Sequence, residues 1–270
     1  MNAQPRSDTR IMAVFCDFEN VALGVRDVKI ASFDIRKVLE RLLLKGNIVV
    51  KKAYCNWERY QDYKRPMHEA AFELIEIPHV RQSGKNSADI RMVVDALDLC
   101  YTKSHVDTFV IVSGDSDFSP LVSKLRENAK TVIGVGVKNS SSDLLINNCD
   151  EFIYYDDLVR ADEQKRRAAK KRRETAPAGA SGDKSNGEKK QEAFDLMLGT
   201  LDALVAERDA DERIWGSMVK QALKRRNPGF NESYYGFRAF SDLLEEAEKK
   251  GLIKLEADEK SGGYVVKPAQ

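Results

Sequence analysis

The sequence predicts an α/β protein in which a mostly parallel sheet carries helices on both faces and a small second module follows. Three observations lead to this prediction. Between residues 10 and 160, short apolar runs alternate with amphipathic segments, as in βα units. Residues 161–190 carry 10 basic and five acidic groups among Ala, Gly and Ser. Residues 191–267 then return to helical patterns and end in a predicted hairpin.

The elements of the first part follow one another in regular order. A buried strand is expected over residues 11–18, and apolar positions three and four apart indicate a helix over 33–45, which Gly46 ends. Further strands are expected over residues 48–55, 75–80, 108–113, 131–137 and 151–155. The helices between them are expected over residues 58–74, 87–101, 117–128 and 142–148. Ligands of such sheets bind beyond the carboxyl ends of the strands.

The second part has the order helix, helix, turn, helix, hairpin. Its helices are expected over residues 193–206, 214–225 and 235–251, its turn over 227–230, and its hairpin strands over 252–255 and 264–266. This order suits a winged-helix domain. We therefore expect a first domain over residues 10–160, a basic flexible linker over 161–190 and a second domain over 191–267.

Composition excludes several classes of protein. No apolar run approaches the ~18 residues of a membrane span, so no membrane contact is expected. The polar residues 1–10 lack the apolar core of a secretory signal, which favours a cytoplasmic protein with its four cysteines reduced. Three histidines without metal-binding spacing give a zinc site or a His-based triad little to be built from. Catalysis should therefore depend on carboxylates.

Acidic and polar side chains follow two of the predicted strands. Asp17 and Asn20 follow the first strand, Asp115 and Asp117 follow the fourth, and Asp89 opens a helix. Any one of these residues is explained more simply as a helix cap. If the two strands are neighbours, however, the carboxylates converge and repel one another, and Mg²⁺ or Mn²⁺ would relieve that repulsion. Such an ion can activate water against a phosphodiester bond.

Three motifs give the first part a family resemblance. They are Asp17-Phe-Glu-Asn20, Gly84-Lys-Asn-Ser-Ala-Asp89 and Ser113-Gly-Asp-Ser-Asp-Phe118. Over residues 10–160 the chain resembles the NYN domain, a PIN-like nuclease family with LabA-like members. The resemblance implies a PIN-like sandwich and metal-dependent cleavage of RNA that leaves 5′-phosphate and 3′-hydroxyl ends. It also implies metal ligands at Asp17, Asp89, Asp115 and Asp117, with Asn20 beside them.

The second part resembles a LOTUS domain, also called OST-HTH. Residues that carry this resemblance include Trp215, Leu223, Phe230, Phe240 and Tyr264, most of which are simply core positions. The resemblance implies binding of single-stranded or structured RNA, including G-rich RNA. It also implies a second copy of the chain or another protein as a partner.

Several further residues are candidates for binding the substrate. In the first part they are Ser113 and Ser116 beside the acids, Lys85 in the second motif, and Lys138 and Ser141 in a turn similar to the family's last βα turn. A basic aromatic cluster of Arg59, Tyr60, Tyr63, Lys64 and Arg65 adds Tyr60, Lys64 and Arg65, and the second part adds Lys224 and Arg225. For the turn at residues 138–143, a solvated loop is an equal interpretation. The basic groups could bind RNA phosphates, and the aromatic rings could stack on unpaired bases.

Two classes of function remain open. The acidic set favours a metal-dependent endoribonuclease with an RNA-binding second module. The tethered second module and the basic linker instead favour a non-cleaving RNA-binding adaptor or regulator. A third interpretation keeps the metal site but takes DNA or a small phosphorylated metabolite as the substrate.

Overall fold

The computed structural model describes residues 9–77, 87–164, 184–207, 212–258 and 263–269. The chain divides into two compact units, Met1–Thr175 and Ala176–Gln270. Each unit has its own sheet, six-stranded in the first and two-stranded in the second. The two units are therefore described separately.

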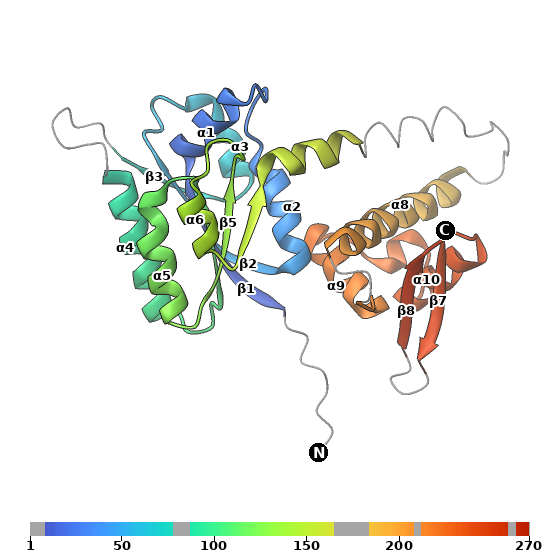
Figure 1. Cartoon of the computed structure of the whole chain (residues 1–270). Coiled ribbons are helices and arrows are strands. Elements are labelled where there is room, and N and C mark those ends of the chain that lie inside the picture. Colours follow the sequence, from blue (N-terminus) through green and yellow to red (C-terminus); the bar gives the residue numbers. More distant parts are fainter. Residues whose placement is uncertain (1–8, 78–86, 165–183, 208–211, 259–262, 270) are drawn as a thin grey trace, which may run out of the picture. The chain divides into compact units, whose positions relative to one another are not determined.

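The first unit is built on a parallel sheet with the strand order β3-β2-β1-β4-β5-β6 (Figure 1). Its strands are β1 (Arg10–Asp17), β2 (Gly46–Cys55), β3 (Glu73–Glu76), β4 (Thr108–Val112), β5 (Thr131–Gly136) and β6 (Glu151–Tyr154). From β1 the chain moves outward through β2 to β3, and it then returns to the other side of β1 with β4. The boundary between β1 and β4 is thus the topological switch point of the sheet. The predicted α/β class is confirmed.

Helices cover both faces of this sheet. They are α1 (Phe18–Asp27), α2 (Ile35–Lys45), α3 (Gln61–Glu69), α4 (Ser87–Thr102), α5 (Ser119–Glu127), α6 (Asp143–Asn148) and the 3₁₀ turn η2 (Ser116–Phe118), and residues 155–164 are also helical. Side chains of α1, α2 and α3 pack in one core and those of α4, α5 and α6 in the other. Figure 1 shows α2 on one side of the strands and α4 and α5 on the other.

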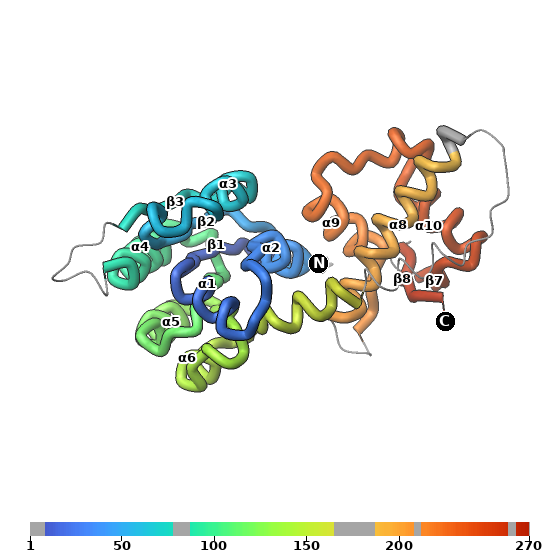
Figure 2. Tube along the Cα trace, turned by 90° about the horizontal axis from the view of Figure 1, so that it is seen from above, coloured from blue at the N-terminus to red at the C-terminus, as the bar shows by residue number. Residues whose placement is uncertain are grey.

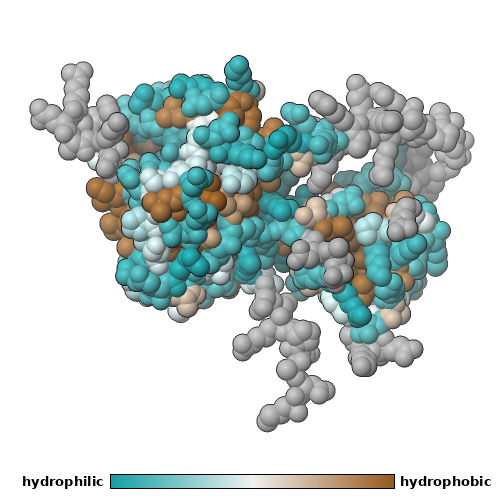
Figure 3. All heavy atoms as spheres, in the orientation of Figure 1, coloured by the Kyte–Doolittle hydropathy of each residue, from teal (hydrophilic) through white to brown (hydrophobic). Residues whose placement is uncertain are grey.

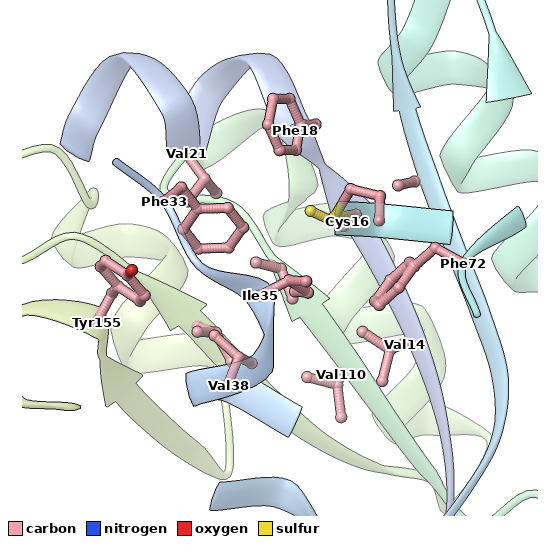
Figure 4. Close-up of a cluster of buried hydrophobic side chains, with 14 of the residues drawn as sticks. Val14, Cys16, Phe18, Val21, Phe33, Ile35, Val38, Phe72, Val110 and Tyr155 are labelled. Carbon is pink, nitrogen blue, oxygen red and sulfur yellow. The ribbon is translucent and has the colours of Figure 1, made fainter. Parts of the chain in front are cut away.

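Alternate side chains along β1 pack in the two cores on opposite faces of the sheet. Met12, Val14 and Cys16 point into the core below α1 and α2, while Ala13 and Phe15 point into the other. Figure 4 shows the first of these cores, where residues of β1 and β4 meet those of α1 and α2. The last six residues of β1, Met12–Asp17, are all buried, so both faces of this part of the strand lie in the core.

Three elements differ from the sequence prediction. Helix α1 was not expected, because Phe18 continues the apolar run of β1; Asp17 in fact caps the helix, and Phe18, Val21 and Val25 form its buried face. Helix α3 is shorter than the expected 58–74, and Ala71 ends it in the left-handed conformation with φ of 58°. Consequently β3 begins before the expected 75–80, of which residues 78–80 lie outside the described residues.

The second unit contains three helices and a hairpin. They are α8 (Lys184–Glu207), α9 (Gly216–Arg226), α10 (Phe240–Lys249) and the antiparallel strands β7 (Ile253–Asp258) and β8 (Gly263–Pro268). The predicted third helix is interrupted, because Gly236 in the left-handed conformation separates α10 from the 3₁₀ turn η3 (Glu232–Tyr235). The order of elements agrees with the sequence prediction, while the winged-helix assignment stays a prediction.

The segment expected to be a linker is helical at both ends. Residues 161–164 continue the last helix of the first unit, and residues 184–190 belong to α8. The basic run at residues 165–173 lies outside the described residues. Figure 2, a view from above, shows the helices on either side of that segment.

Burial agrees with the expected state of the cysteines. All four are free; Cys16, Cys55 and Cys100 are buried and Cys149 is half-buried. Among the helices that the structure describes, none combines the length and the apolar character needed to cross a membrane. Figure 3 shows a mostly hydrophilic surface with small hydrophobic patches.

Candidate functional site

The carboxyl ends of β1 and β4 meet at the switch point. Cys16 pairs with Val112 in the sheet, so the next residues, Asp17 and Ser113, are neighbours. The Ser113 hydroxyl donates a hydrogen bond of 3.0 Å to Asp17 Oδ2 and accepts one of 3.2 Å from the Asp115 N–H. Both Ser113 and Asp17 are buried. The two strand ends therefore form one connected polar site.

Asn20 ties the start of α1 to the turn after β4. Its backbone N–H donates to Asp17 Oδ1 at 3.4 Å, and its side-chain oxygen accepts from the Gly114 N–H at 2.8 Å. Asp115 in turn accepts from the Asp117 N–H at 3.0 Å, and so caps η2. Helix capping is thus real for Asp17 and Asp115, but the two caps share a single hydrogen-bonded network.

The acidic residues of this site influence one another. Burial, and then the charge of Asp89, raise the pKa of Asp17 to about 7, although hydrogen bonds from Ser113 and Asn20 oppose this. Burial, followed by the charges of Asp115 and Asp117, raises the pKa of Asp89, which lies half-buried in the first turn of α4. Three distant segments therefore bring the four predicted acids into one electrostatic site.

This donor set fits a hydrated divalent ion. Within the described residues, no three His, Cys, Asp or Glu side chains already surround a single point closely enough to hold a metal. The site nevertheless offers only oxygen donors, and their negative charges destabilise one another. Mg²⁺ commonly binds through one or two carboxylates and keeps several waters, so it does not need a closed cage of protein ligands.

The turn after β5 packs directly against the turn after β4. The Ser142 N–H donates to the Gly114 carbonyl at 2.9 Å, and a Cβ atom at Gly114 would lie only 2.5 Å from the Ser140 carbonyl. A Cβ atom at Gly136 would lie 2.3 Å from Ser141 Oγ. Ser141 is therefore next to the site, with its hydroxyl donating to the Val137 carbonyl at 2.8 Å.

The other candidate residues of the first unit lie at different places. Ser116 is half-buried in η2 beside the acids, and Lys138 is exposed with its Nζ 5.9 Å from the Tyr154 ring centre. Tyr60 and Lys64 are half-buried near the start of α3. Arg65 pairs with Glu69 one turn along α3, at 2.8 Å. Lys85 lies outside the described residues.

Lys224 and Arg225 belong to the second unit, near the end of α9. Lys224 is exposed and lies 4.0 Å from a carboxylate oxygen of Glu232. Burial lowers the pKa of Arg225. With Arg226, these two residues make the last turn of α9 basic.

Glu19 was not singled out by the sequence reasoning. Its charge contributes to the raised pKa of Asp89, after burial and the charges of Asp115 and Asp117, so it lies within reach of the site. The sequence feature that could have pointed to Glu19 is its position inside the first motif, between Asp17 and Asn20. Asp95 by contrast accepts hydrogen bonds from Tyr54, Lys52 and Arg91, of 2.8, 3.4 and 3.0 Å.

A parallel sheet with acidic side chains at its switch point is consistent with a PIN-like nuclease fold. Residues 11–156, more than half of the chain, match the family model of the NYN domain. The chain belongs to the NYN domain family, and its first unit has that family's nuclease-like fold.

Two proteins are similar to part of this chain. An uncharacterized protein of Methanocaldococcus jannaschii is 30% identical over 122 residues, which are 45% of this chain and 48% of that protein. The chain thus spans about half the length of this curated relative. A crystal structure of a protein of unknown function from Vibrio parahaemolyticus is similar with a TM-score of 0.51 and 26% identity, over 57% of this chain and 98% of that one.

Proposed function

We propose that the chain is a metal-dependent endoribonuclease that hydrolyses RNA phosphodiester bonds in its first unit and selects RNA through its second unit. One observation carries this proposal: Asp17, Asp89 and the pair Asp115 and Asp117 come from three separate segments, yet their charges act on one another at the switch point. Structural capping alone gives no reason for Asp89 to join the other three acids.

The acidic residues would hold Mg²⁺ or Mn²⁺ through Asp17, Asp89, Asp115 and Asp117. A bound ion of this kind makes water a stronger nucleophile and neutralises charge on the phosphate. Ser113 holds the Asp17 carboxylate in a fixed orientation, and Asn20 holds the turn at Gly114 beside it. A carboxylate of the same site that does not hold the ion could accept the proton that the water releases.

Cleavage of a mixed RNA panel tests the proposal. Labelled single-stranded and structured RNAs, with one DNA strand of matched sequence, are incubated with Mg²⁺ or Mn²⁺ and with a chelator. We expect metal-dependent products that disappear in Asp17→Asn and Asp115→Asn while RNA binding persists. Asp98→Asn, at an exposed acid of α4, is the matched control and should cut normally. Cleavage of the DNA strand alone would overturn the assignment to RNA.

A non-cleaving RNA-binding adaptor is the second candidate, and one feature of the second unit favours it. The Tyr234 side chain is 61% exposed, and Lys189 Nζ lies 4.8 Å from its ring centre. An exposed ring next to a cation suits stacking of unpaired bases. If the wild-type chain binds RNA but cuts nothing with either metal, this second function replaces the first.

A further inference from the structure

The turn between β2 and α3 lies beside the acidic site. Asp17 pairs with Tyr54 in the sheet, so the residues after β2 emerge at the same edge. The buried Trp57 fixes this turn, because its backbone N–H donates to Glu76 Oε1 at 3.0 Å and its ring N–H donates to the Ile75 carbonyl at 3.2 Å. Residues 56–60 are therefore held rigidly next to Asp17.

Aromatic packing joins this turn to the start of α1. The Phe18 ring directly follows Asp17 and lies 5.0 Å from the Trp57 ring and 5.4 Å from the Tyr60 ring, between ring centres. Figure 4 shows Phe18 at one end of the buried cluster, beside Cys16. Aromatic pairs at such distances stabilise a fixed geometry. The position of Tyr60 is thus tied to that of the acidic strand end.

Arg59 extends from this turn toward Glu19. Its guanidinium Nη1 lies 3.3 Å from Glu19 Oε1, and the two side chains are 60% and 38% exposed. An ion pair this exposed contributes little to stability. Arg59 can therefore exchange Glu19 for a phosphate at little cost, and guanidinium groups bind phosphate oxygens in pairs.

Two more cations lie around Tyr60. Burial and the charge of Glu19 raise the pKa of Tyr60, whereas Arg59 and Arg26 oppose that rise. Arg26 is exposed in the last turn of α1, and Lys64 is half-buried in α3. A half-buried aromatic ring is thus bordered by basic side chains, immediately next to carboxylates that would otherwise repel a nucleic acid.

We propose that Arg59, together with Arg26 and Lys64, forms a phosphate-binding track that holds a phosphate flanking the cleaved bond of single-stranded RNA, while Tyr60 stacks on one of its bases. This proposal rests on the proposed nuclease function. A single strand is required because only unpaired bases can reach a side-chain ring. Cations spread over α1, the turn after β2 and α3 suit successive phosphates along a polymer.

Photo-crosslinking of RNA to the full chain tests the track directly. A 12-nucleotide single-stranded RNA containing 5-iodouridine is irradiated with the protein in a chelator, so that no cleavage is needed, and crosslinked peptides are mapped by mass spectrometry. We expect a crosslink at Tyr60 whose yield falls about tenfold in Arg59→Gln, as a lost charge-assisted contact predicts. Arg126→Gln is the matched control, since Arg126 pairs with Asp150 at 3.1 Å in the last turn of α5, away from the carboxyl ends of the strands, and its yield should stay at the wild-type level.

The salt dependence of RNA binding adds a second readout. The slope of log affinity against log salt should be smaller by about one for Arg59→Gln than for Arg126→Gln. Equal yields and slopes in the two variants, or no crosslink in residues 56–64, would overturn the track. A crosslink without any cleavage would overturn the nuclease and leave the track, whereas cleavage without a crosslink would do the reverse.

Discussion

Ser113 joins the ends of two strands, because its hydroxyl donates to the Asp17 carboxylate at 3.0 Å and accepts from the Asp115 backbone at 3.2 Å. The hydroxyl therefore fixes an acid of β1 relative to the turn that carries two more acids. Ser113 is completely buried, so this link is part of the core and not a surface cap. The arrangement of the acids depends on it.

The first prediction concerns Ser113→Ala. The substitution leaves a buried carboxylate oxygen and the Asp115 N–H without their shared partner, which should cost about 1–3 kcal/mol of the free energy of unfolding. Cleavage should fall roughly 10- to 100-fold, because the acids lose their fixed geometry. Rates of RNA cleavage and chemical denaturation measure the two effects. Ser119→Ala is the control, since Ser119 is also buried but its hydroxyl has no hydrogen-bond partner among the described residues; a similar loss of cleavage there would contradict the prediction.

The second prediction concerns the stability of Asp17→Asn without metal. The pKa of Asp17 is raised to about 7 in the folded chain from an ordinary value of 3.8. Folding therefore takes up a proton between these pH values, and stability falls as the pH rises through that window. Because one pKa unit corresponds to ~1.4 kcal/mol, the full penalty above pH 7 is on the order of 4 kcal/mol. Asn avoids this penalty but loses part of the hydrogen bonding, so a net gain of roughly 2 kcal/mol is expected at pH 8.

Thermal melts in a chelator from pH 4 to pH 8 measure this gain, which should vanish toward pH 4. Asp34→Asn is the control, and its effect on stability at pH 8 should have the opposite sign. Although burial acts to raise the pKa of Asp34, hydrogen bonds and charge from Arg36 lower it overall. Its ionised form therefore stabilises the fold above the unfolded pKa, and that stability is lost as the pH falls. Asp34→Asn should destabilise the chain at pH 8, and a gain there would show that the two carboxylates are not distinguished by their surroundings.

The third prediction concerns Tyr234→Ala in the second unit. Stacking of a base on an aromatic ring contributes about 1–3 kcal/mol, so the affinity for single-stranded RNA should fall at least about fivefold. Fluorescence anisotropy with the full chain measures it. Tyr101→Ala is the matched control, because the Tyr101 side chain is similarly exposed, at 64%, but lies on α4 of the first unit. Equal affinities for the two variants would place the stacking surface elsewhere.

The sequence was sufficient for the α/β class and for most strands of the sheet, because apolar runs are local patterns. Whether the acids meet depended on β1 and β4 being neighbours, and that pairing is not a local pattern. The sequence was not sufficient for α1, where Phe18 extends the apolar pattern of β1 past the capping residue Asp17. The sequence also did not show that Glu19 lies within reach of the site, or that Arg59 and not Arg65 extends toward it. Both arginines stand in one basic cluster, and only the packing of Trp57 and Phe18 directs the first of them toward the acidic site.

The last prediction concerns Gly114→Ala and depends on close packing rather than on charge. A Cβ atom at this position would lie 2.5 Å from the Ser140 carbonyl and 2.9 Å from Ser141 Cα, so the backbone of one turn must move. Overpacking of this kind costs typically about 1–3 kcal/mol of the free energy of unfolding.

The movement also stretches the hydrogen bonds of Gly114 to Asn20 and Ser142, which hold the acidic turn in place. The rate of RNA cleavage should therefore fall even at a temperature where the variant is fully folded. A lower melting temperature alone would leave that rate unchanged. Gly229→Ala, with open space around its Cβ position, should change neither quantity. Unchanged cleavage in a destabilised Gly114→Ala would show that the turn after β5 supports the fold without positioning the acids.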